Sequence, residues 1–154
     1  MLSSDQVVHD LYAEDSEVRA ALEHRFGTLD RGRIAELVFA DRDELAWLEQ
    51  LLHPRVRERY AAWLADVCAP VAVVEIPLLY ETGADTLFDS VVVITAPEQL
   101  RTSRRGESVT ERSPRLLPDD EKMRRATYSY VNDGSLAELD AFVQAVLGRL
   151  QSDV

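Results

Sequence analysis

Two residue types are almost absent from this sequence. Among 154 residues, Cys68 is the only cysteine and Lys122 is the only lysine. A single cysteine excludes an intramolecular disulfide and a zinc site built from several cysteines. No apolar run approaches the roughly 18 residues of a membrane-spanning helix, and the first residues lack the basic-then-apolar pattern of a secretory signal. We therefore expect a cytoplasmic protein without a membrane partner.

A phosphate-binding glycine loop is also missing. Such a loop reads Gly-x-x-x-x-Gly-Lys-Ser/Thr, and its backbone N–H groups and lysine hold the β- and γ-phosphates of a nucleotide. Lys122 lies among acidic and basic residues of an expected helix, so it is not a loop lysine. The glycines never take the required spacing; they stand at positions 27, 32, 83, 106, 134 and 148.

The charge balance narrows the choice of partners. Acidic residues outnumber basic ones by 28 to 17, which gives a formal net charge of −11. This balance argues against nucleic acid or a membrane surface as the partner of the whole chain. Arginines nevertheless cluster between Arg101 and Arg125, which leaves a local anion site open. The length and the 46% apolar content suit one globular domain.

The first two-fifths of the chain show helical spacing of apolar residues, interrupted by capping residues. We expect a helical block over residues 5–66. Its predicted boundary residues are Asp5, Asp30 and Asp41 as N-caps, Ser16 as a helix start, Gly27 as a helix end, and Pro54 as the first turn of a separate helix. The aromatic residues Phe39, Trp47, Tyr60 and Trp63 are expected to pack inside this block.

The second half alternates strand-like and helix-like segments. Residues 71–76 and 90–95 are apolar on both faces, which predicts strands buried on both sides, and residues 128–131 form a third short strand. Helices are expected after Pro97, from Pro118 to Ala126, and from a Ser135–Glu138 capping box to Leu150, the last with Leu136 on its core face. Alternation of this kind predicts an α/β fold with parallel strands and right-handed crossovers.

A candidate site follows the first of these strands. In parallel α/β sheets, ligands bind beyond the carboxyl ends of the strands. Glu75, Pro77 and Glu81 stand at such an end. Two carboxylates and a turn-forming proline at this edge predict a ligand-binding loop.

Several motifs stand in order along nearly the whole chain. They are Ser4-Asp5-Gln6-Val7-Val8, Leu51-Leu52-His53-Pro54, Glu75-Ile-Pro-Leu-Leu-Tyr-Glu81 and Val131-Asn132-Asp133-Gly134-Ser135, supported by residues 29–40 and 117–122. Together these motifs resemble the dephospho-CoA kinase family. The family opens with a strand, a glycine loop and a helix before the aspartate block. Here Met1 stands only four positions before Asp5. The resemblance therefore indicates a truncated reading frame of such a kinase.

The resemblance implies a fold as well as an activity. The fold is α/β, a three-layer parallel sheet of the P-loop nucleotide-kinase type, lacking the first strand, the phosphate loop and the first helix. In the implied strand order 2-3-1-4-5, residues 72–76 and 90–95 lose their shared neighbour. We expect marginal folding, direct pairing of these two strands, or self-association through their unpaired edges. One partial domain is expected over residues 1–154, with a helical acceptor-binding region at 5–66, core sheet and helices at 71–100 and 127–150, and a lid at 101–126.

The implied reaction is ATP-dependent phosphorylation of the ribose 3′-hydroxyl of dephospho-CoA, with Mg²⁺ and ATP as cofactors and the phosphate-loop ligands absent. Catalytic roles fall to Asp5, which would orient the hydroxyl or accept its proton, and to the lid arginines Arg112 and Arg115. Substrate-binding roles fall to His53, Glu75, Pro77, Leu78 and Glu81, and nucleotide-binding roles to Asn132 and Asp133.

Each of these residues has a structural alternative. Asp5 is also a suitable helix N-cap, and His53 precedes a proline at an expected helix junction. Glu75 and Glu81 would equally be solvated strand-end residues, and the arginines part of a charged loop. Asn132 and Asp133 also fit a turn and a helix cap.

Two other functions stay open for the whole chain. The first is a non-catalytic module that binds dephospho-CoA or CoA. The second is another nucleotide kinase of the same architecture. Without the phosphate loop, we expect the chain to be inactive by itself, because phosphoryl transfer depends on positioning and charge neutralisation.

Overall fold

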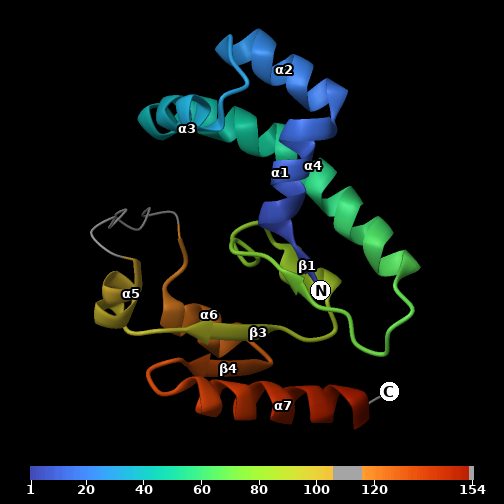
Figure 1. The fold of residues 1–154 in the computed structure, drawn as a ribbon, viewed down its shortest axis with the longest axis vertical. Helices are drawn as coiled ribbons and strands as arrows, with labels where there is room; N and C mark the ends of the chain where they lie inside the picture. Colours follow the sequence, from blue (N-terminus) through green and yellow to red (C-terminus); the bar gives the residue numbers. More distant parts are fainter. Residues whose placement is uncertain (106–115, 153–154) are drawn as a thin grey trace. The chain divides into compact units, whose positions relative to one another are not determined.

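The computed structural model describes residues 1–105 and 116–152, which form two compact units, Met1–Pro77 and Leu78–Val154 (Figure 1). Arg112 and Arg115 lie outside the described residues. Both units combine helices with one pair of parallel strands, which confirms the α/β class. No helix in the described ranges has the length and apolar character needed to cross a membrane.

The first unit is mostly helical, as the spacing of apolar residues predicted. Its elements are β1 (Leu2–Ser3), α1 (Ser4–Glu14), α2 (Ser16–Phe26), α3 (Arg31–Ala40), α4 (Arg42–Asp66) and β2 (Val74–Glu75). The core holds Leu11, Val18, Leu22 and Ile34, each fully buried. α1 packs on both α2 and α4, and α3 packs on α4. This core fixes the helix that follows β1 and thereby the residues at the strand end.

Most of the predicted caps are confirmed. Asp30 accepts from the Arg33 N–H at 2.7 Å, Asp41 accepts from the Asp43 N–H at 2.8 Å, and Gly27 ends α2 at φ 68°. The expected cap at Asp5 is wrong. Ser3 is the N-cap of α1, and Asp5 lies within its first turn. The helix begins earlier than expected because β1 ends directly in it.

The predicted helix start at Pro54 is also wrong, since α4 runs through this residue without interruption. Proline has no N–H to donate to the carbonyl four residues earlier, and this normally breaks a helix. Here Leu52 and Val56 are buried on either side of it, and the Arg55 guanidinium donates to the Leu51 carbonyl at 2.9 Å. Packing and this side-chain hydrogen bond outweigh the local break.

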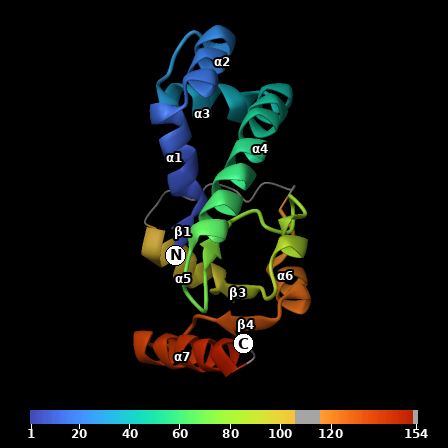
Figure 2. The same cartoon turned by 90° about the vertical axis from the view of Figure 1, so that its right-hand side faces the viewer.

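The second unit contains η1 (Ala84–Leu87), β3 (Val92–Thr95), α5 (Glu98–Arg105), α6 (Asp119–Arg125), β4 (Tyr128–Val131) and α7 (Leu136–Ser152). The capping box is confirmed: Glu138 accepts from the Ser135 N–H and hydroxyl at 2.6 and 2.8 Å. α7 lies along β4 (Figures 1 and 2), and Phe142 stacks on Tyr130 with ring centroids 4.8 Å apart. Asn132 and Asp133 therefore follow a strand that is backed by a helix.

The strands form two separate parallel pairs. β1 pairs with β2, with Ser3 opposite Glu75, and β3 pairs with β4, with Thr95 opposite Val131. These are the neighbours 2–3 and 4–5 of the expected strand order. Within the described residues, β2 and β3 belong to different sheets, so the direct pairing considered above is not found.

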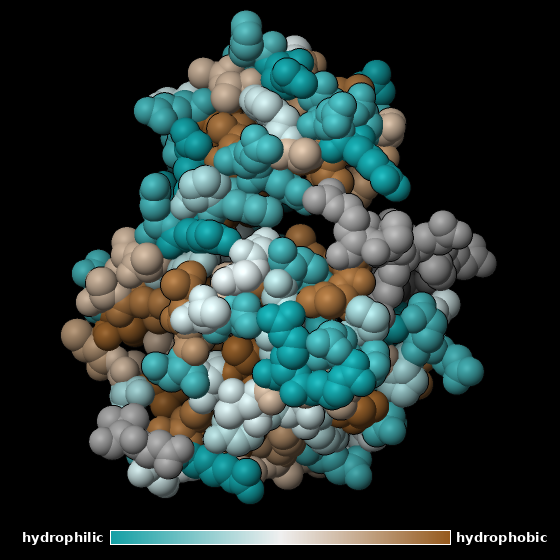
Figure 3. All heavy atoms as spheres, turned by 180° about the vertical axis from the view of Figure 1, so that it is seen from behind, coloured by the Kyte–Doolittle hydropathy of each residue, from teal (hydrophilic) through white to brown (hydrophobic). Residues whose placement is uncertain are grey.

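The expectation that the strands are buried on both sides is wrong. Val73, just before β2, is 45% exposed, and Val92 and Ile94 of β3 are 42% and 49% exposed, so one face of each segment is open to solvent. Leu136 and Phe39 were expected inside but are 81% and 76% exposed. Leu136 is the first residue of α7. Hydrophobic side chains accordingly reach the surface among hydrophilic ones (Figure 3).

Candidate functional site

In the first unit, the candidate residues gather at the carboxyl edge of the β1–β2 pair. Ser3 and Glu75 are register partners, and the Ser3 hydroxyl donates to Glu75 Oε2 at 2.8 Å. Asp5 follows Ser3 by two residues and is exposed in the first turn of α1. Because parallel strands end at the same edge, Glu75 and Asp5 both stand close to the edge at which α/β folds bind ligands.

The other predicted substrate residues are more dispersed. His53 is half-buried in the middle of α4 and has an interaction partner. Pro77 is exposed at the end of the first unit, and Leu78 is the half-buried first residue of the second. Glu81 also belongs to the second unit. The structure thus brings Asp5 and Glu75 to one edge, while Leu78 and Glu81 form part of another body.

Glu81 is held by the helix that follows the undescribed segment. Its Oε1 lies 2.7 Å from Lys122 Nζ of α6 and accepts from the Leu117 N–H at 3.0 Å. The exposed fractions of the Glu81 and Lys122 side chains are 13% and 18%. The only lysine of the sequence therefore fixes the loop after Pro77 to α6.

The pKa of Glu81 results from two opposed effects. Burial favours the neutral acid and would raise the pKa. The hydrogen bonds from Lys122, from the Glu81 N–H and from the Leu117 N–H, together with the charge of Lys122, outweigh burial and hold the pKa of Glu81 below its ordinary value. Glu81 is therefore a carboxylate at neutral pH.

Tyr80 lies beside this pair and is also buried. The Arg125 guanidinium stacks over its ring at 4.3 Å and pairs with Asp85 at 3.0 Å. Burial raises the pKa of Tyr80, although the charge of Arg125 opposes the shift. The Tyr80 hydroxyl and Glu81 Oε2 are buried without a hydrogen-bond partner among the described residues. The loop is thus held by charged side chains of α6 and keeps two unpaired oxygens.

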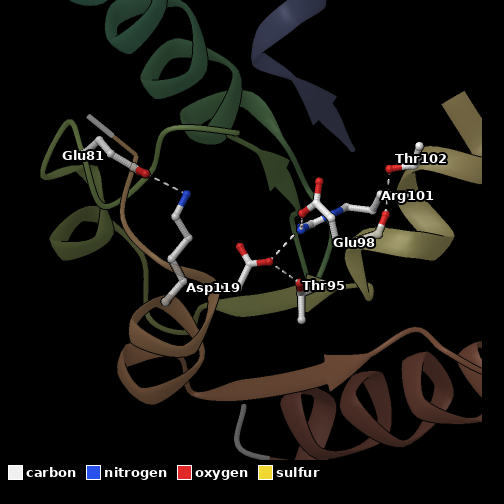
Figure 4. A network of polar contacts seen from close by, with 7 residues as sticks. Glu81, Thr95, Glu98, Arg101, Thr102 and Asp119 are labelled. Carbon is white, nitrogen blue, oxygen red and sulfur yellow. Dashed lines mark hydrogen bonds and ion pairs between the residues drawn. The ribbon is translucent and has the colours of Figure 1, made fainter. Parts of the chain in front are cut away.

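A second polar cluster lies at the carboxyl end of β3. Asp119 Oδ2 accepts from the Thr95 hydroxyl and from Arg101 Nη1, both at 2.7 Å, and Glu98 pairs with Arg101 at 2.6 Å (Figure 4). The hydrogen bond to Asp119 is the main cause that raises the pKa of Arg101. Arg101, one of the arginines of the predicted lid, therefore forms ion pairs with two carboxylates, those of Glu98 and Asp119.

The predicted nucleotide-binding residues adjoin this cluster. The Asn132 N–H donates to the Thr95 carbonyl at 2.7 Å, so Asn132 stands at the same sheet edge as Thr95. The Asp133 N–H donates to the Val131 carbonyl at 3.0 Å and closes a turn. Both residues directly follow β4, and the turn agrees with the structural alternative given for them, while their role in nucleotide binding stays a prediction.

The sequence analysis missed Lys122, Thr95 and Asp119 as site residues. Each contacts a residue that is distant in the sequence; Thr95 and Asp119, for example, are separated by 24 positions. Local patterns report helix faces and caps, and no such pattern marks a long-range ion pair. The only available signal was the position of Thr95 and Asp119 at a strand end and a helix start.

The described residues do not fit a magnesium-triphosphate group. No cluster of three or more His, Cys, Asp or Glu in the described ranges is arranged to hold a metal ion. The sequence also lacks the glycine loop that would hold the phosphates.

A polar hollow of about 550 Å³ occurs elsewhere in the first unit, at the start of α2. Its lining contains none of the predicted site residues; it consists of Asp15, Ser16, Glu17, Arg55 and Glu58. The strand-end residues are thus separate from this hollow.

Comparison with known proteins identifies one family. Residues 2–138 match the family model described as dephospho-CoA kinase. A dephospho-CoA kinase of Thermus thermophilus is 37% identical over 80% of this chain, and one of Rhodopseudomonas palustris is 34% identical over 94% of it. The chain spans 64% of the length of the Thermus protein and 79% of the Rhodopseudomonas protein.

The fold has a close match among solved structures. A dephospho-CoA kinase from Campylobacter jejuni superposes with a TM-score of 0.69, covering 99% of this chain and 86% of that one. The sequence identity is 22%, so this similarity concerns the fold alone.

Proposed function

The chain belongs to the dephospho-CoA kinase family, and we propose that it binds dephospho-CoA as the acceptor-side part of a kinase that phosphorylates the ribose 3′-hydroxyl with ATP. The match of residues 2–138 to the family carries this proposal. The α/β fold and the carboxylates at the β1–β2 edge support it, because acceptor hydroxyls in such folds are bound at strand ends.

The residue roles follow from the chemistry of the transfer. Asp5 would orient the 3′-hydroxyl or accept its proton, with Glu75 at the same edge and His53 on α4 contributing to the acceptor region. Pro77, Leu78 and Glu81 would shape the loop after β2. Asn132 and Asp133 would contact the nucleotide, and Arg112 and Arg115 would neutralise the phosphate in transfer.

A second candidate function rests on a sequence observation. Because no segment reads Gly-x-x-x-x-Gly-Lys-Ser/Thr, a chain of this sequence by itself would bind dephospho-CoA or CoA without catalysing transfer. Both functions share the acceptor site and differ only in the triphosphate site. We also propose that the chain is cytoplasmic and that it self-associates through the unpaired edges of β2 and β3.

Thermal unfolding with ligands tests these alternatives. Dephospho-CoA should raise the unfolding temperature of the chain, because a ligand that binds only the folded state stabilises it. Mg-ATP should have little effect on the chain alone. Fusing a strand, a Gly-x-x-x-x-Gly-Lys-Ser loop and a helix, the segment with which the family opens, before Met1 should add an ATP-dependent shift and transfer to dephospho-CoA. A chain that dephospho-CoA does not stabilise would contradict both functions, and preference for a nucleoside monophosphate would indicate a different nucleotide kinase.

A further inference from the structure

Ser3 occupies the N-cap position of α1, but its side chain does not cap the helix. Its backbone has the extended geometry of an N-cap, at φ −106° and ψ 128°, yet its side chain makes no hydrogen bond to the first turn of α1. The other helix N-caps of the same unit, Asp15, Asp30 and Asp41, all accept such bonds. Serine is among the preferred capping residues, so the missing cap needs another explanation.

The hydroxyl of Ser3 is used by Glu75 instead. It donates to Glu75 Oε2 at 2.8 Å, across the strand register that places Ser3 opposite Glu75. An exposed glutamate has three rotatable side-chain bonds and is otherwise free to change rotamer. The hydrogen bond therefore restricts the carboxylate to the carboxyl edge of the strand pair.

Within the described residues, no cationic side chain pairs with the carboxylates at this edge. Neither Glu75 nor Asp5 forms an ion pair with a described arginine, lysine or histidine. Two such carboxylates accept hydrogen bonds from neutral hydroxyls and repel anionic groups. Carboxylates at this edge would therefore accept a hydrogen bond from a neutral ribose hydroxyl and would repel a negatively charged ribose phosphate.

We propose that Ser3 is a positioning residue, which holds Glu75 at the strand end from which α1 and Asp5 follow, so that this edge accepts a ribose hydroxyl and rejects a ribose phosphate. The inference rests on the proposed function, because it takes dephospho-CoA as the ligand and CoA, its 3′-phosphorylated form, as the product. Ser3 thereby favours substrate over product without touching the reacting atoms.

Equilibrium binding of the whole chain to dephospho-CoA and to CoA, measured by titration calorimetry, tests the proposal. The wild-type chain should prefer dephospho-CoA by about tenfold, the effect of one unfavourable charge contact at close range. Glu75→Gln should reduce this preference severalfold, mainly by tightening CoA binding. Ser3→Ala should reduce it about twofold to threefold, and Ser3→Thr, which keeps the hydroxyl, should restore it.

The ratio of the two affinities does not depend on how much protein is folded, so a loss of stability in Ser3→Ala leaves the readout valid. Matched controls are Ser16→Ala and Glu14→Gln, exposed residues of the same unit whose side chains form no ion pair or hydrogen bond in the described structure. Both controls should keep the wild-type preference.

Three results would overturn the inference. An unchanged preference in Glu75→Gln removes the role of the carboxylate, and an unchanged preference in Ser3→Ala removes the role of the serine, in each case with dephospho-CoA binding intact. Absence of binding to both ligands by the wild-type chain overturns the proposed function itself and the inference with it.

Discussion

Lys122 Nζ lies 2.7 Å from Glu81 Oε1, and this ion pair joins α6 to the loop that follows β2. Removing one partner leaves a mostly buried charge without compensation, which is more costly than the pair itself is stabilising. Glu81→Gln and Lys122→Met should each lower the free energy of unfolding by about 3 kcal/mol, measured by urea denaturation.

Replacing both partners at once is the informative control. Glu81→Leu combined with Lys122→Met removes both charges and should recover much of the loss. If either single replacement costs less than about 1 kcal/mol, the pair behaves as a surface ion pair and does not fix the loop.

The same pair predicts a pH dependence of stability. The pKa of Glu81 is lower in the folded protein than its ordinary value of 4.5. The charged form is therefore favoured by folding, so this contribution is complete above the ordinary pKa and is lost as pH falls through the folded one. Urea midpoints of the wild type and of Glu81→Gln should converge below about pH 4.5. A constant difference down to strongly acidic pH would contradict this assignment.

The Thr95 hydroxyl gives a third prediction. It donates to Asp119 at 2.7 Å, so Thr95→Val, which keeps the branched shape but removes the donor, should destabilise the chain by about 1 kcal/mol. Thr95→Ser keeps the donor and serves as the matched control in the same urea denaturation. Stability equal to the wild type in Thr95→Val would show that the Thr95 hydroxyl does not contribute to the stability of this cluster.

Replacing Pro54 is expected to raise the free energy of unfolding, unlike the replacements above. Pro54→Ala restores a backbone donor inside α4, but it also increases the freedom of the unfolded chain. The net gain in unfolding free energy should be about 1–2 kcal/mol by urea denaturation. A loss of stability would instead show that the proline-shaped backbone is needed for the packing of Leu52 and Val56.

These residues also show which parts of the structure the sequence could predict. Local signals worked where a residue satisfies its own neighbours: Asp30 and Asp41 cap helices, Ser135 and Glu138 form a capping box, and β4 has the predicted bounds. Such hydrogen bonds are set by residues two or three positions apart.

The local signals failed where tertiary contacts decide the structure. The break expected at Pro54 was overridden by packing on both sides of it, and Ser3 binds Glu75 in place of its own helix. Burial of Val92 and Ile94 depends on what covers β3, and the apolar run cannot specify this. The Glu81–Lys122 pair joins residues from distant segments that carry no shared motif.

The free edge of β3 gives the last prediction. Within the described residues, β3 pairs with β4 on one side only, and its Val92 and Ile94 are 42% and 49% exposed. Exposed apolar edge strands pair with other chains, whereas a lysine on such a strand opposes pairing. We expect the chain to self-associate with rising concentration in sedimentation velocity, and Ile94→Lys to shift it towards the monomer. Leu136→Lys is the matched control, because Leu136 is 81% exposed and belongs to α7 and not to a strand edge. A wild-type chain that stays monomeric throughout, or equal weakening by both variants, would show that the β3 edge is not the contact.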